Sequence, residues 1–298
     1  MNLYADAQTI LREAIAAVQP EAAVTRALAQ LPPCHGRRIL VAVGKAACPM
    51  ASAALQALDG HVHAGIVITK HGHGVPLPAP LQVLEAGHPV PDAATYAATA
   101  QALALTANLT PADQVLFLLS GGGSALFEQP LIPAEEMADV TRQLLACGAN
   151  IVEMNTLRKR LSAVKGGRFA QRCAPAHVYT VVLSDIIGDP LDMIASGPAY
   201  PDASTCGQAK EIVARYGLRL SERAQALIAQ ETPKALENVT TFVTGSVKQL
   251  CRTAERVCRE LGYEPVTLTA SLSCEAREAG AFLAAIARDH QSDGKALA

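Results

Sequence analysis

The chain has 298 residues, of which half are apolar and 17% are charged, and its formal net charge at pH 7 is −2. This composition supports a large hydrophobic core and excludes an intrinsically disordered chain, and the balanced charge gives no reason to expect a nucleic-acid partner. The eight cysteines are scattered without a Cys-x-x-Cys pair, which favours free thiols over a zinc site or a disulfide framework.

The N-terminal segment, residues 1–19, has an amphipathic helical pattern and lacks the basic start and apolar run of a signal peptide. The nearly uncharged stretch 39–58 is long enough to raise the question of a membrane span. Gly44, Lys45 and Pro49 divide it, however, into a short strand, a turn and a helix. We therefore expect a cytoplasmic protein without a membrane partner.

Short β-rich runs then alternate with helical patterns. Strands are expected at 38–43, 65–69, 81–85, 115–119, 178–184, 240–244 and 264–269, and helices at 46–58, 93–107, 133–147, 221–230 and 247–261. Continuous apolar runs such as 115–119 suit strands that are buried on both faces. The pattern predicts an α/β fold with a doubly wound, mostly parallel sheet sandwiched by helices, which is Rossmann-like. Residues 1–290 are expected to form this domain, and 291–298 a linker.

The loop after the first expected strand contains Lys45 at the start of a helix. A lysine there can place its ammonium beside a phosphate that backbone N–H groups attract. The loop is no Walker A motif, because Ile39 replaces its first glycine and Ala46 its Ser/Thr. The structural alternative is a surface lysine. We favour a functional one, because a cation is unfavourable at the positive end of a helix unless an anion binds there.

A glycine-rich loop, residues 120–124, follows the fourth expected strand. It consists of Ser120, Gly121, Gly122, Gly123 and Ser124. Three glycines in a row cost backbone entropy, which indicates a positive φ or a close approach, and their N–H groups suit phosphate or carboxylate oxygens. A plain tight turn needs fewer glycines. A nucleophile elbow is excluded, because Leu126 occupies the position of its last glycine.

A basic segment, residues 155–168, carries several cations around an apolar stripe. The net charge argues against a nucleic-acid patch, and Lys159 and Arg160 fit a solvated helix face. Lys165 has more of the character of a site, because the two glycines after it should break the helix. The candidates in this segment for contact with an anionic ligand are Asn155, Arg158, Lys165 and Arg168.

Two aspartates, Asp185 and Asp189, follow the expected strand at 178–184. Carboxylates at a strand end can hold Mg²⁺, and one of them can accept a hydroxyl proton. Aspartate and glycine also favour simple turns, but the density of Asp, Gly, Pro and Ser over 184–198 favours a functional loop. Both are expected as metal ligands, and Asp189 also as a catalytic base. His71, His73 and His88 are interpreted as loop residues, because no third metal ligand is spaced nearby.

Taken together, these segments resemble the ATP-dependent glycerate 2-kinase family, whose bacterial members have also been called hydroxypyruvate reductases. The matching stretches, in the family's order, are AVGKAA (42–47), ITKHGH (68–73), EAGHPVPD (85–92), LSGGGSAL (119–126), NTLRKRLSAVKGGR (155–168), SDIIGDPLDMIASGP (184–198) and VTGS (243–246). The resemblance implies a Rossmann-like domain, a smaller second domain and an active site between them. It also implies Mg²⁺-dependent transfer of the ATP γ-phosphoryl group to the C2 hydroxyl of D-glycerate.

The family's catalytic lysine falls on Lys45, its glycine-rich loop on 120–124, and its aspartate loop on Asp185 and Asp189. The sequence ends at Ala298, near the point where the family's second domain is expected to begin. We therefore expect this polypeptide alone to fold but to transfer phosphoryl groups poorly.

Phosphoryl transfer requires positioning and charge neutralisation, so Lys45, the glycine-rich loop and Asp189 are expected to meet at one edge of the sheet. The alternatives are an NAD(P)-dependent hydroxypyruvate reductase, which the absence of a Gly-x-Gly-x-x-Gly fingerprint disfavours, and a non-catalytic metabolite-binding domain. The expected ligands are glycerate, ATP and Mg²⁺, and a homodimer is left open.

Overall fold

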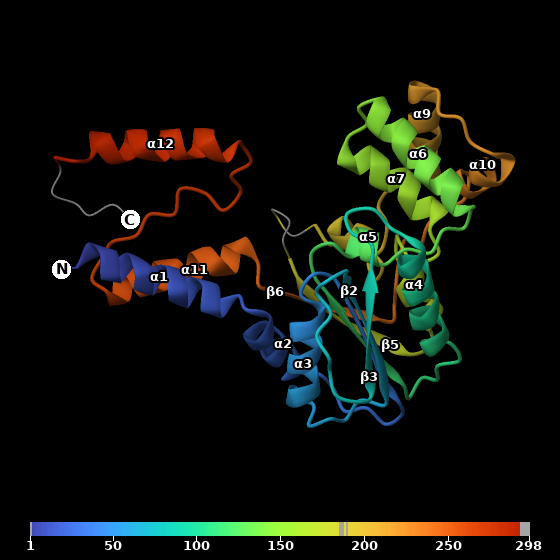
Figure 1. Cartoon of the computed structure of the whole chain (residues 1–298), viewed down its shortest axis with the longest axis horizontal. Helices are drawn as coiled ribbons and strands as arrows, with labels where there is room; N and C mark the ends of the chain where they lie inside the picture. The colour runs from blue at the N-terminus through green and yellow to red at the C-terminus, as the bar shows by residue number, and fades with distance from the viewer. Residues whose placement is uncertain (1, 185–187, 189, 293–298) are drawn as a thin grey trace.

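The computed structural model describes residues 2–184, 188 and 190–292. Its centre is a parallel sheet of six strands in the order β3-β2-β1-β4-β5-β6 (Figure 1). The strands are β1 (Arg38–Val43), β2 (Ala64–Lys70), β3 (Leu81–Ala86), β4 (Gln114–Leu119), β5 (His177–Leu183) and β6 (Val239–Thr244). The expected doubly wound fold is confirmed, and each of these strands ends within one residue of its expected bounds.

The seventh expected strand, at 264–269, is wrong. The segment forms no strand, and Val266 and Leu268 are 79% and 62% exposed. Its alternating pattern resembles that of a strand, but strand propensity reflects packing against neighbouring strands. No described strand pairs with this segment, and β6 is the last strand of the described sheet.

Helices cover both faces of the sheet and extend beyond its end. They are α1 (Leu3–Ala17), α2 (Pro20–Leu28), α3 (Ala47–Ala57), α4 (Ala93–Leu105), α5 (Gly123–Leu126), α6 (Ala134–Ala146), α7 (Ile151–Leu161), α8 (Arg168–Cys173), α9 (Cys206–Tyr216), α10 (Glu222–Ile228), α11 (Val247–Glu260) and α12 (Ala276–Asp289), with a 3₁₀ turn η1 (Ile194–Ser196). All the expected helices are present. Among the described helices, none combines the length and apolar character needed to cross a bilayer.

Strand β1 shows why the strands read as continuous apolar runs. Ile39, Val41 and Val43 pack into one core layer, whereas Leu40 and Ala42 pack into the other. Successive side chains of a strand point to opposite faces, so both faces must be apolar when helices cover both. Helices α2 and α3 cover one face, and α4 and α8 cover the other.

Four helices, α6, α7, α9 and α10, form a helical lobe around a separate core. Its buried side chains are Ile132, Met137, Val140, Leu144, Met154, Leu157, Leu161, Ala209, Ile212, Ala224 and Ile228. Figure 1 shows this lobe on the side of the sheet toward which the β3 arrow points. The lobe therefore stands over the carboxyl ends of the strands, where ligands of such sheets bind.

Candidate functional site

The strand order places a topological switch point between β1 and β4. From β1 the chain continues to β2 on one side, and from β4 it continues to β5 on the other. Such a divergence opens a crevice at the carboxyl ends of the two strands. The loops that leave these strands carry Lys45 and the glycine-rich loop, so the fold itself brings the two together.

Direct contacts join these loops. The backbone N–H of Lys45 donates to the Gly121 carbonyl at 2.9 Å, and the N–H of Ala46 donates to Ser120 Oγ at 3.1 Å. The expected meeting of Lys45 with residues 120–124 is confirmed, and the ligand-binding role of the loops stays a prediction. Asp185 and Asp189, also expected there, lie outside the described residues.

Two glycines are required by this close approach. Gly44 has φ +125°, and a Cβ at this position would lie 2.2 Å from Ser120 Oγ. Gly122 has φ +91°, and its Cβ would lie 3.1 Å from the His88 ring and 3.4 Å from Lys45 Cγ. Residues with a side chain rarely adopt such positive φ values, and a Cβ would also meet neighbouring atoms. Only glycine therefore lets the loops and His88 pack this closely.

A lysine side chain lies at the mouth of the crevice. The Lys45 side chain is exposed, and its ammonium forms no hydrogen bond or ion pair with another described residue. Partial burial, followed by the charges of Lys45 and Lys70, lowers the pKa of His88, which is therefore neutral at pH 7. An anion is the natural counter-charge for the Lys45 ammonium.

His71 lies beside two acidic side chains. Its Nε2 lies 2.7 Å from Asp92 Oδ2 and its Nδ1 3.9 Å from Glu85 Oε2. Burial alone would raise the pKa of Asp92, but hydrogen bonds from His71 and Thr95 lower it to about 2. Among the described residues no three His, Cys, Asp or Glu side chains gather where they could hold a metal.

Asn155 joins the glycine-rich loop through an intermediate serine. Ser124 Oγ lies 3.1 Å from Ser196 Oγ, which in turn donates to Asn155 Oδ1 at 3.0 Å. Ala195 and Ser196 have φ of 51° and 61°, a conformation that costs non-glycine residues free energy and is concentrated at functional sites. Sequence reasoning covered Ser196 only as part of a loop rich in Asp, Gly, Pro and Ser, and gave it no role of its own.

Lys165 and Arg158 support the loop from within the protein. Lys165 is 0% exposed, and its ammonium donates to the carbonyls of Ser124 at 2.8 Å and Phe127 at 3.0 Å and faces Glu128 at 3.2 Å. Burial lowers the pKa of Lys165 to about 8. Arg158 donates to the same Ser124 carbonyl at 3.3 Å. This enclosure differs from the expected contact with a ligand, because the Lys165 ammonium faces protein acceptors.

The Arg168 side chain lies at the end of α7. Its Nη1 donates to the carbonyls of Lys159, Arg160 and Ser162 at 3.3, 2.9 and 2.7 Å. A helix leaves its last carbonyls without intrahelical partners, and the Arg168 guanidinium satisfies them here. The structure thus gives Arg168 a place in the framework of α7, and its contact with an anionic ligand stays a prediction.

The interpretation of Lys159 and Arg160 as a solvated helix face is wrong. They are 2% and 0% exposed, and both face the fully buried carboxylate of Asp202, at 3.2 Å and 3.7 Å. The local pattern could not reveal this, because Asp202 lies more than forty residues further along the chain. Buried charges of this kind persist only when they are paired.

Comparisons with known proteins agree on one group of relatives. Residues 6–229 match a family described as "Domain of unknown function (DUF4147)". A D-glycerate 2-kinase of Thermotoga maritima is 48% identical over 282 residues, covering 94% of this chain and 67% of that protein. A glycerate 2-kinase of Pyrococcus horikoshii is 38% identical over 87% of this chain and 61% of its own length. A protein of Agrobacterium vitis, 39% identical over 97% of this chain and 66% of its own length, bears a hydroxypyruvate reductase name.

A solved structure agrees with the sequence matches. The crystal structure of a glycerate kinase from Thermotoga maritima superposes with a TM-score of 0.93 at 47% identity, covering 98% of this chain and 70% of that one. The chain thus spans about two thirds of the length of the curated relatives it matches.

Proposed function

This chain belongs to the family described as DUF4147, whose relatives include glycerate 2-kinases, and on this premise we propose that it carries phosphoryl-transfer machinery of an ATP-dependent D-glycerate 2-kinase. The observation that carries the proposal is the pairing of Lys45 with the glycine-rich loop at the switch point. An ammonium without a described protein partner lies beside a loop whose backbone can approach phosphate closely.

In this reaction the C2 hydroxyl oxygen of D-glycerate attacks the γ-phosphorus of ATP. The bond from that phosphorus to the β,γ-bridging oxygen breaks, and ADP leaves with the electron pair. The hydroxyl proton passes to Asp189, the proposed base, which lies outside the described residues. Because such a transition state needs little covalent help, charge and positioning supply most of the catalysis.

Each part of the site has a proposed role. The Lys45 ammonium stabilises negative charge on the transferred phosphoryl group or the substrate carboxylate, and the loop N–H groups and hydroxyls cradle the phosphate. Lys165 and Arg158 hold Ser124 in place through its carbonyl. The proposed ligands of Mg²⁺ are Asp185 and Asp189, both outside the described residues. When bound, the ion would screen the charge of the phosphates.

The second candidate is a hydroxypyruvate reductase, which the name of the Agrobacterium relative favours. The strand order is one that dinucleotide-binding folds share. Against it, the loop between β1 and α3 lacks the Gly-x-Gly-x-x-Gly fingerprint that brings a pyrophosphate close to the backbone.

The test is ADP release with D-glycerate, ATP and Mg²⁺, measured together with NAD(P)H absorbance with hydroxypyruvate. It uses this chain and a chimera that adds the part of the Thermotoga protein outside the match. ADP release that depends on D-glycerate, with 2-phosphoglycerate as the product, is expected, and more of it from the chimera. Nicotinamide oxidation without ADP release by either protein would contradict the proposal.

A further inference from the structure

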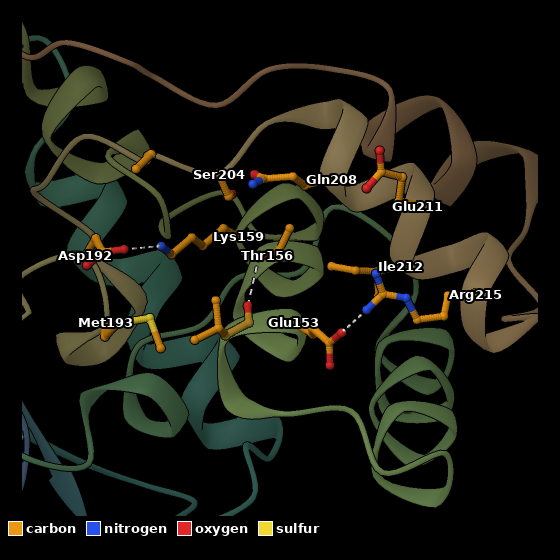
Figure 2. Close-up of a pocket in the computed structure, with 12 residues that line it drawn as sticks. Glu153, Thr156, Lys159, Asp192, Met193, Ser204, Gln208, Glu211, Ile212 and Arg215 are labelled. Atoms are coloured by element: carbon orange, nitrogen blue, oxygen red, sulfur yellow. Dashed lines mark hydrogen bonds and ion pairs between the residues drawn. The ribbon is translucent and has the colours of Figure 1, made fainter.

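A cleft of about 410 Å³ lies between α7 and α9 in the helical lobe (Figure 2). Sites for small molecules commonly have volumes in this range. A three-carbon acid such as glycerate would fill only a small part of it. Of the reactants in the proposed reaction, only the nucleotide is large enough to use such a space.

The cations that line this α7–α9 cleft are already neutralised. The Lys159 ammonium lies 3.4 Å from Asp192, and the Arg215 guanidinium lies 2.8 Å from Glu153 (Figure 2). Glu211, also on the wall, has an exposed carboxylate without a hydrogen bond or ion pair to another described residue. The cleft therefore has no surplus positive charge and is poorly suited to a phosphate or carboxylate group.

The remaining wall suits a neutral group with an aromatic face and hydroxyls. The half-buried Met193 supplies apolar surface, to which the largely buried Ile212 adds little, and Gln208 supplies a neutral hydrogen-bonding side chain. Figure 2 shows Met193 on one side of the cleft and Gln208 on the other, with Glu211 near Gln208. Carboxylates at comparable sites accept hydrogen bonds from the hydroxyls of a ribose.

A short series of contacts joins this cleft to the glycine-rich loop. Ser124 contacts Ser196 at 3.1 Å, Ser196 contacts Asn155 at 3.0 Å, and Asn155 Nδ2 lies 3.7 Å from Met193 Sδ. Met193 is part of the cleft wall. A neutral cleft and a positive loop thus lie a few side chains apart, which matches the neutral and anionic halves of a nucleoside triphosphate.

We propose that the α7–α9 cleft binds the nucleoside half of ATP, with the base against Met193 and the ribose hydroxyls on Glu211. The triphosphate then extends from the cleft toward Lys45. This inference rests on the proposed function and adds the subsite for the phosphoryl donor.

The first test fills the cleft. Ala203 lines it and is exposed, so Ala203→Trp places an indole in the cleft without disturbing a buried residue. The matched control is Ala235→Trp, at an exposed loop alanine outside the cleft. Calorimetric titration of the 298-residue chain with ATP is expected to show at least about tenfold weaker binding for Ala203→Trp and no change for the control. Unchanged affinity in Ala203→Trp, or no ATP binding by the wild type, would overturn the inference.

The second test addresses the ribose. Wild type is expected to bind ATP about tenfold more tightly than 2′,3′-dideoxy-ATP, because only ATP offers hydroxyls to Glu211. Glu211→Gln is expected to reduce this preference to about twofold or less. Glu237→Gln, at an exposed carboxylate outside the cleft, is expected to keep it. An unchanged preference in Glu211→Gln would overturn the assignment of the ribose.

Parallel turnover measurements separate the two proposals. ATP binding that Ala203→Trp weakens, without transfer to glycerate by chain or chimera, would refute the kinase function and leave the cleft assignment standing. Transfer by the chimera with an unchanged KM for ATP in Ala203→Trp would keep the function and refute the cleft assignment.

Discussion

The loops at the sheet edge and the basic segment that supports them differ in how their lysine side chains are placed: one is exposed and the other is buried. Lys45 is exposed and has no hydrogen bond or ion pair from its ammonium to another described residue. Lys165 is completely buried, where two carbonyls and the Glu128 carboxylate surround its ammonium. Both lysines stand next to glycines in the sequence, so residue type and neighbours alone do not separate them.

This difference separates a cation that is available to a ligand from one that fixes the protein around the ligand. A buried ammonium needs acceptors, because leaving water costs several kcal/mol unless they are present. One of those acceptors is the Ser124 carbonyl, so the Lys165 ammonium holds the end of the glycine-rich loop. The two lysines therefore act on one site, one directly and one through the backbone.

The largest expected effect on stability comes from breaking the buried pair. Lys165→Met leaves the enclosed Glu128 with only the more distant Arg158 guanidinium, at 3.9 Å, so the free energy of unfolding is expected to fall by about 3 kcal/mol. Denaturant titration measures this. Lys165→Met combined with Glu128→Gln removes both charges and is expected to recover part of the loss. A Lys165→Met protein as stable as wild type would mean that the pair does not support the loop.

The next largest effect concerns the close approach of the two loops. Gly44→Ala combines a positive φ with a Cβ that would meet Ser120, and is expected to cost about 3 kcal/mol of stability. Gly60→Ala is the matched control, because Gly60 also has a positive φ but no atom within 4 Å of its Cβ, so about 1 kcal/mol is expected. Equal losses in the two variants would show that the contact with Ser120 is unimportant.

The next prediction concerns Arg168, which either supports α7 or contacts the substrate. Arg168→Ala removes the donor for the last carbonyls of α7 and is expected to lower the free energy of unfolding by about 1–3 kcal/mol. The KM for glycerate in the chimera is expected to stay unchanged. A large rise in that KM with unchanged stability would indicate that Arg168 contacts the substrate instead of supporting α7.

The smallest effect is a dependence on pH. The pKa of Lys165 is about 8 in the folded protein and about 10.5 when solvated, so between these values the unfolded chain binds more protons. Stability from this group is therefore expected to rise with pH, by about 1 kcal/mol from pH 8 to pH 9 relative to Lys165→Met. Denaturant titrations of both proteins at the two pH values measure it. A parallel pH dependence of the two proteins would contradict the assignment.

Much of the fold could be predicted from sequence because parallel strands covered on both faces read as unbroken apolar runs. The meeting of Lys45 with the glycine-rich loop could also be predicted, because such loops follow strands and parallel strands end at one edge. The burial of Lys159, Arg160 and Lys165 could not, because it depends on carboxylates that the chain brings back from a distance. The α7–α9 cleft was missed because α9 was not among the expected helices, although Thr205 and Gln208 form a capping box at its start.

The most direct test of the central claim is the rate of phosphoryl transfer to D-glycerate by the chimera carrying Lys45→Met. Loss of one charge contact in the transition state is expected to lower kcat about 100–1,000-fold, with the unfolding transition unchanged. Lys248→Met, which removes an exposed cation of α11 outside the two loops, is expected to retain most of the rate. Wild-type turnover by Lys45→Met would contradict the account, because the exposed lysine at the switch point would then have no part in the chemistry.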